Sequence, residues 1–115
     1  MPSLSAITIA LFGVTALFAG ISTLLSPTLS LSTFNLPESA RPAVLGNGLA
    51  AFAMGQYYIL AAFQENKTFF MLTIPMRGLT ALVFWGQGGP WKIPAIWEAV
   101  AAVVTAVALS WEGRS

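Results

Sequence analysis

Four polar side chains inside long apolar stretches are the residues of this chain best suited to chemistry. They are Asn47, Gln56, Arg77 and Glu98. An ionisable group deep in a membrane-crossing segment costs roughly 2.5–3.5 kcal/mol, so it usually faces a partner or a cavity. Glu98 can donate or accept a proton, and the guanidinium of Arg77 can stabilise an oxyanion or an enolate. Together they predict acid–base catalysis, most concretely the isomerisation or cyclisation of a lipophilic intermediate.

Missing residue types exclude several other kinds of chemistry. The chain has no His and no Cys, and its four acidic residues are all Glu. Zinc sites built from Cys and His, His- or Cys-ligated haem, iron–sulfur clusters and Ser-His-Asp triads are therefore excluded. Five basic residues spread along the chain cannot form the positive surface that nucleic acid requires. We expect no metal, no cofactor and no nucleic-acid partner.

The elements that must position these residues are long apolar runs. Apolar residues make up 57% of the chain and charged residues only 8%, against about 25% charged in a typical soluble domain. Four runs are each about as long as the roughly 20 residues that cross a bilayer, and they lack the alternation of a barrel strand. They cover residues 4–25, 43–63, 68–86 and 94–111. These runs predict an all-α fold, a transmembrane four-helix bundle that forms one integral membrane domain over residues 1–115.

The first run could alternatively be a cleaved signal peptide. It has no basic residues before it, and it is longer than the apolar core of such peptides. Four spans are therefore the stronger interpretation, with the lipid bilayer surrounding the chain.

Depth in the bundle predicts that three of the polar residues meet. With four spans, the segments 26–42 and 87–93 lie on one side. Counted from that side at 1.5 Å per residue, Asn47 and Glu98 lie about 6 Å deep and Arg77 about 13 Å deep. An extended Arg side chain can close a gap of roughly 7 Å. We therefore predict Glu98 as the acid–base group, Arg77 as the anion stabiliser and Asn47 as an orienting group.

Further residues complete the predicted binding site for a lipophilic small molecule. Tyr57 and Tyr58 lie deeper and offer hydroxyl groups, while Gln56 lies near the middle of its run, about 180° around the helix from Asn47. The full set of predicted substrate-binding residues is Asn47, Gln56, Tyr57, Tyr58 and Trp97.

Two other functions remain open from the residues alone. A proton-coupled small-molecule carrier would use Glu98 as its titrating group. A structural or partner-binding membrane subunit would use Arg77 and Glu98 as an internal salt bridge that orients two helices. Neither needs a cofactor.

Small and hydroxyl residues recur at helical spacing. Gly13, Ala16 and Gly20 form one stripe; Gly48, Ala51, Gly55 and Ala62 form another. Such stripes let helices approach closely, within one bundle or across a homodimer. The hydroxyls of Thr8, Thr15 and Ser22 are expected to bond back to their own helix. The linker 26–42 contains three prolines that discourage a continuous helix, and it is expected to lie on the membrane surface or to cap the bundle.

These features resemble a known family. A glycine-dotted first span closed by Pro27, the segment Leu36-Pro37-Glu38, an Arg-centred third span (Arg77-Gly78-Leu79) and Glu98 early in the fourth carry the likeness. The chain resembles small, uncharacterised four-span membrane proteins common in filamentous fungi, some encoded near natural-product pathways. The resemblance implies a role with small molecules in biosynthesis, and the endoplasmic reticulum as the membrane. Family members tend to carry charged residues where this chain has Asn47 and Phe84-Trp85.

Overall fold

The computed structural model describes residues 2–113, and this part of the chain is all-helical, as the sequence predicts. Each of the four apolar runs lies within one long helix, although α3 and α5 begin slightly earlier than the runs themselves. The helices are α1 (Leu4–Leu25), α2 (Pro27–Thr33), α3 (Arg41–Phe63), α4 (Lys67–Gln87) and α5 (Lys92–Glu112), with short 3-10 helices η1 (Glu38–Ala40) and η2 (Gly89–Trp91).

Local chemistry explains where these helices begin and end. The Ser3 hydroxyl accepts the amide of Ala6 at 3.1 Å, and the Asn66 side chain accepts the amide of Phe69 at 3.0 Å. Both are N-cap bonds that satisfy an amide lacking a partner within its helix. Gly88 ends α4 with a φ of 72°, a backbone conformation that glycine adopts without strain.

The linker between α1 and α3 is more ordered than the sequence analysis expected. The chain does break at Ser26, but Pro27 then stands in the first turn of α2, where its missing amide costs nothing. The three prolines predict only that no continuous helix fills the linker, and the separate elements α2 and η1 agree with this. The short helix α2 is an addition to that prediction, because a proline in the first turn does not prevent a helix. Leu31 of α2 is buried, so this helix packs on the rest of the chain.

Glycines bring the backbones of α1 and α3 into direct contact. A Cβ atom at Gly20 would lie 2.6 Å from the backbone nitrogen of Phe52, and one at Gly55 would lie 2.6 Å from the carbonyl oxygen of Gly13. No side chain fits at these distances, so the two glycine stripes pack within one chain. A homodimer would therefore need a surface other than these stripes.

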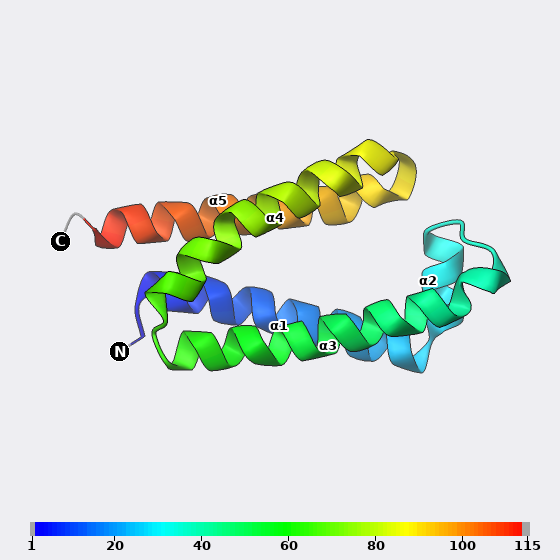
Figure 1. Ribbon diagram of the computed structural model, residues 1–115, viewed down its shortest axis with the longest axis horizontal. Coiled ribbons are helices and arrows are strands. Elements are labelled where there is room, and N and C mark those ends of the chain that lie inside the picture. The colour runs from blue at the N-terminus through cyan, green and yellow to red at the C-terminus, as the bar shows by residue number, and fades with distance from the viewer. Residues whose placement is uncertain (1, 114–115) are drawn as a thin grey trace.

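The long helices form two antiparallel pairs, α1 with α3 and α4 with α5 (Figure 1). The pairs meet at the end that holds the start of α1 and the α3–α4 turn, and diverge toward the end that holds α2 and η2. Phe34, after α2, bridges the pairs at that second end, with its ring centroid 4.2 Å from that of Trp91 in η2. Pro75 lies inside α4 and removes one backbone hydrogen bond from it.

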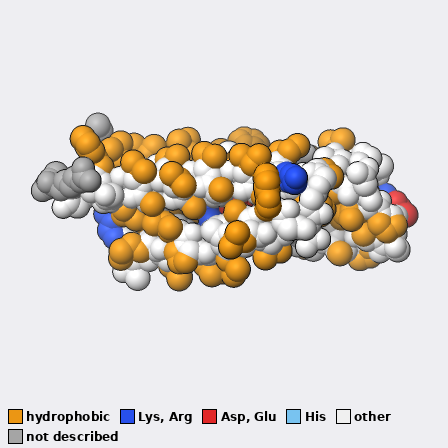
Figure 2. All heavy atoms as spheres, turned by 90° about the horizontal axis from the view of Figure 1, so that it is seen from above, with side chains coloured by type: hydrophobic (Ala, Val, Ile, Leu, Met, Phe, Trp, Pro, Cys, Tyr) orange, Lys and Arg blue, Asp and Glu red, His pale blue; other side chains and the backbone are white. Residues whose placement is uncertain are grey.

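Apolar side chains cover much of the surface (Figure 2). Within residues 2–113, three helical segments are long and apolar enough to cross a membrane, namely Leu4–Leu25, Lys67–Gln87 and Gly89–Glu112. Helix α3 has the length, but Asn47, Gln56 and two tyrosines lower its apolar character.

Adding a methyl group at the α1–α3 contact should destabilise the protein. Gly20→Ala and Gly55→Ala force backbones apart, so we expect both variants to unfold at a clearly lower temperature in detergent, followed by circular dichroism. Gly46→Ala and Gly78→Ala are matched controls, because nothing lies within 4 Å of a Cβ at either position. The controls should unfold at the same temperature or higher, since alanine favours a helix by about 0.5–1 kcal/mol over glycine. An equal loss in all four variants would contradict this packing.

Candidate functional site

Arg77 is buried between the two helix pairs. The residue is only 2% exposed, and its side chain comes from α4 toward α1 and α3. Its guanidinium carbon lies 3.7 Å from the ring centroid of Phe12 and 4.7 Å from that of Tyr58. These two rings lie beside each other, with their centroids 5.2 Å apart. Arg77 is thus held over an aromatic surface, an arrangement worth about 2 kcal/mol when water is excluded.

The guanidinium of Arg77 has no hydrogen-bond acceptor. Its Nε, Nη1 and Nη2 atoms are all buried, and none has a partner among residues 2–113. A buried donor without a partner costs about 1–3 kcal/mol, and more when it is charged. The aromatic rings and the nearby Tyr58 hydroxyl therefore offset part of the cost of burial, while the three buried nitrogens keep unused hydrogen-bonding capacity.

Glu98 is the second buried ionisable residue and comes from α5. It is 6% exposed, and its charge lies near enough to that of Arg77 for the two to attract each other. Within the described part of the chain, however, no nitrogen–oxygen contact of 4 Å or less joins them, and Glu98 makes no hydrogen bond. The internal salt bridge that the structural alternative requires is therefore not formed.

The other predicted residues divide into two groups. Tyr58 is buried and faces Arg77. Trp97 stacks on Phe12, with the two ring centroids 4.5 Å apart. Asn47, Gln56 and Tyr57 are exposed, and they make no hydrogen bond among the described residues. The structure thus places Tyr58 against Arg77 and Trp97 against Phe12, and leaves the other three outside this cluster. Phe12 belongs to the cluster too, although its aromatic type alone gave no signal for it.

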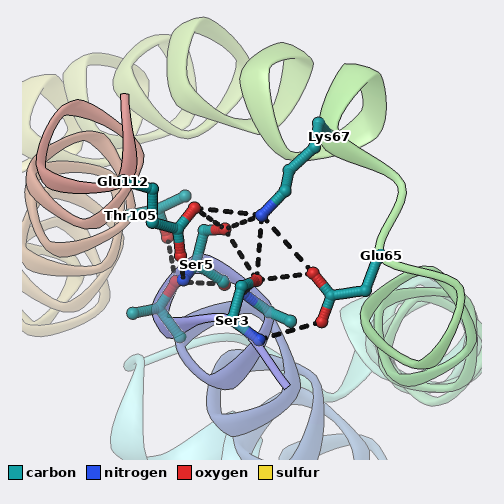
Figure 3. Close-up of polar contacts among 8 residues, drawn as sticks. Ser3, Ser5, Glu65, Lys67, Thr105 and Glu112 are labelled. Carbon is teal, nitrogen blue, oxygen red and sulfur yellow. Dashed lines mark hydrogen bonds and ion pairs between the residues drawn. The ribbon is translucent and has the colours of Figure 1, made fainter. Parts of the chain in front are cut away.

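A polar end cluster holds the two helix pairs together (Figure 3). Glu112 accepts the amide and hydroxyl of Ser5, both at 2.7 Å, and Glu65 accepts those of Ser3 at 2.9 and 2.6 Å. Lys67 donates to both serine hydroxyls and lies 3.0 Å from Glu112 and 3.4 Å from Glu65. The start of α1, the α3–α4 turn and the end of α5 are therefore joined at one end of the bundle.

Sequence reasoning missed this cluster, because its partners are far apart along the chain. The only available signal was topological: four antiparallel spans place the N-terminus, the α3–α4 turn and the end of α5 on one side. The contact of Lys67 with Ser3 could resemble a Ser–Lys nucleophile. Such a nucleophile needs a neutral amine, whereas this ammonium is paired with the carboxylates of Glu65 and Glu112. We therefore assign the cluster a structural role.

Two hollows lie away from Arg77. One, of about 430 Å³, adjoins the polar end cluster at Lys67 and Glu112. The other, of about 550 Å³, is an apolar groove between α4 and α5, with small residues such as Gly78 and Ala99 among its lining. Neither is lined by Arg77 or Glu98.

Comparisons with protein families, with curated proteins and with solved structures find no match to this chain. The resemblance to the fungal four-span proteins therefore stays a prediction.

Glu65 should make stability depend on pH in the acid range. Hydrogen bonds from Ser3, assisted by Lys67, hold the pKa of Glu65 below its ordinary value of 4.5. A carboxyl whose pKa falls on folding stabilises the protein above its unfolded-state pKa, and this contribution is lost as the pH falls through the folded-state pKa. We expect the unfolding temperature to drop below pH 4.5, and Glu65→Gln to reduce that drop.

Two serine variants control this measurement. Ser3→Ala removes one of the bonds to Glu65 and should also reduce the acid-induced drop. Ser39→Ala changes an exposed serine that makes no hydrogen bond in the described range, and it should leave the drop unchanged. An unaltered pH profile in Glu65→Gln would show that this carboxylate does not contribute.

Proposed function

We propose that this chain is a four-span integral membrane protein whose helix pairs bind a lipophilic small molecule and isomerise or cyclise it by acid–base catalysis, without a cofactor. The membrane part of the proposal is supported by three helices of sufficient length and apolar character. It is also supported by the many large apolar side chains at the surface, such as Leu25 at 82% and Phe63 at 89% exposure. In water these side chains would favour aggregation, whereas lipid accommodates them.

Helix α3 crosses with the others in this proposal. It lies along α1 at backbone contact, and it joins α1 to α4 through the α3–α4 turn. If α1 and α4 both cross the bilayer, then α3, a helix of 23 residues packed along α1, must cross it as well. Lipid imposes helical structure on every segment at this depth, because backbone groups there find no water.

One observation carries the catalytic part: Arg77 is buried without a hydrogen-bond acceptor, and Glu98, which is also buried, receives no hydrogen bond among the described residues. In a protein that uses both only for structure, the two charges would pair directly, because pairing lowers the cost of burying each. We propose that a polar group of the ligand inserts between these two charges, which make no direct contact with each other.

The chemistry follows from what these groups can do. The carboxylate of Glu98 removes a proton from a carbon next to a carbonyl of the bound molecule. The electron pair moves onto the carbonyl oxygen, and the N–H groups of Arg77 stabilise the resulting enolate. Glu98 then returns the proton at another carbon, so a double bond shifts and no atom is gained or lost. Tyr58 and Trp97 supply aromatic walls that exclude water.

A long-chain β,γ-unsaturated ketone tests this proposal, because its conjugated product absorbs in the ultraviolet. Wild-type protein in detergent should accelerate the conversion, and Glu98→Gln should lower the rate by about 10²–10⁴, the usual contribution of a general acid–base group. Arg77→Gln should also lower it strongly. The matched control is Glu38→Gln, an exposed carboxylate outside the long helices, which should convert at the wild-type rate.

Two results would reject the catalytic proposal. The first is conversion by Glu98→Gln and Arg77→Gln at the wild-type rate. The second is no conversion by the wild type, with uptake of the ketone into proteoliposomes that depends on a pH gradient; that result would assign Glu98 to a carrier instead.

A further inference from the structure

The face of α1 that contacts α5 is covered at one end only. Thr8 makes a hydrogen bond of 2.9 Å with Thr105 of α5. Thr15 follows it by about two helical turns on the same face, yet it is exposed and donates only to the carbonyl of Phe12 in its own helix. Ser22, a further two turns along, is exposed as well. Helix α5 therefore covers this face near the polar end cluster and leaves it beyond Phe12.

The inner face of α3 changes in the same way. Tyr58 is buried against Arg77, whereas Asn47, about three turns away on the same face, is exposed. Figure 1 shows the two helix pairs diverging over this half. The contact between Phe34 and Trp91 then bridges the pairs at the far end. The exposed stretch of α1 and α3, called the uncovered half below, thus runs from the level of Arg77 to these two rings.

We infer that the uncovered half between the helix pairs holds a monoanionic amphiphile, such as a long-chain carboxylate, which reaches Arg77 sideways from the membrane. This inference rests on the membrane setting of the proposed function and adds a ligand class that competes with the ketone for Arg77. The acidic head binds at Arg77, and the chain lies along Thr15 and Asn47 toward Trp91. From Arg77 to the end of α4 is about 15 Å at 1.5 Å per residue, which sets the length of chain that fits.

The charges present select a single negative charge. A guanidinium matches a carboxylate with two parallel hydrogen bonds, and all three nitrogens of Arg77 lack a partner. Among the described residues, no second basic side chain lies against the rings of Phe12 and Tyr58, and Lys67 is engaged in the polar end cluster. The carboxylate of Glu98 repels any anion, so the single positive charge of Arg77 can balance one negative charge at most. A dianionic phosphate would therefore lack the cations that it needs.

The polar groups along the uncovered half favour a chain that carries oxygen atoms. Thr15, Ser22 and Asn47 expose hydroxyl and amide groups within helices that we propose to cross the bilayer. The side chains of Ser22 and Asn47 make no hydrogen bond among the described residues, which is costly in lipid, and the Thr15 hydroxyl donates only to its own helix and can still accept. Hydroxyl or keto groups on the bound chain give them partners, so an oxygenated amphiphile should bind more tightly than a plain one.

Bromine quenching of tryptophan tests the head position and the chain direction together. The probes are 2-bromododecanoate and 12-bromododecanoate, which carry bromine beside the head and at the tail. We expect the first to quench Trp97 and the second to quench Trp91, with the signals assigned by Trp97→Phe and Trp91→Phe. Arg77→Gln should weaken binding at least about tenfold, because a charged hydrogen-bonded pair is lost. Arg77→Lys keeps the positive charge but cannot make two parallel hydrogen bonds to a carboxylate, so it should bind the acids with intermediate affinity.

Two further variants test the route. Thr15→Phe fills the uncovered half and should weaken binding of both acids. Val14→Phe is the matched control on the outward face of α1 and should not. A brominated alkyl trimethylammonium is the cationic control probe. Its quenching of Trp97 should not exceed the nonspecific quenching measured in Arg77→Gln, which comes from partitioning of the probe into detergent.

Several outcomes would overturn the inference. They are equal quenching of Trp97 in wild type and Arg77→Gln, equal quenching by the cationic probe, and displacement of the acids by phosphatidylglycerol, which would assign the site to a membrane phospholipid. The two proposals fail separately. Acid binding without ketone conversion would leave the ligand class standing and reject the enzyme, whereas conversion that neither acid inhibits would reject the ligand class alone.

Discussion

The backbone contact between α1 and α3 is the constraint on which the rest of the structure depends. A Cβ at Gly13 would lie 2.9 Å from both the carbonyl oxygen of Gly55 and the Cβ of Tyr58. The absence of a side chain at this one position lets Tyr58 lie beside Phe12, the neighbour of Gly13. Those two rings form the surface that carries the guanidinium of Arg77. The buried cation is therefore possible because glycines, which offer no chemistry themselves, fix the spacing of two aromatic rings on different helices.

The two ends of the bundle are stabilised by different forces. At one end, charged and hydroxyl groups bridge elements that are distant in sequence, with Lys67 central among them. At the other, the aromatic contact of Phe34 with Trp91 bridges two connections between helices. Hydrogen bonds of the first kind are directional and tie α5 to the start of α1. A single ring contact constrains the second end far less, so the helix pairs can diverge there, beyond Arg77.

Sequence reasoning recovered the elements better than the contacts between them. Apolar runs of bilayer length predicted all four long helices, because length and composition are local properties. Depth along the runs predicted that Arg77 and Glu98 meet, and the structure buries both side chains without a contact of 4 Å or less between them. The same reasoning failed for Asn47, because equal depth does not specify how far apart two helices lie, and the pairs diverge at that level. The bonds of Ser3 and Ser5 join residues 62 and 107 positions apart, so no pattern of spacing could show them.

Polar groups without hydrogen-bond partners are the feature of this fold that favours a functional interpretation over a purely structural one. Where the helix pairs touch, the polar groups are paired: Thr8 with Thr105, and Ser5 with Glu112. Where they diverge, Asn47 is exposed, and the nitrogens of Arg77 lack acceptors although they are buried. A sequence selected only for stability in lipid would place apolar residues there, because an unpaired polar group in hydrocarbon costs several kcal/mol. The polar groups thus follow the uncovered half, which is the distribution expected if a ligand supplies the missing partners.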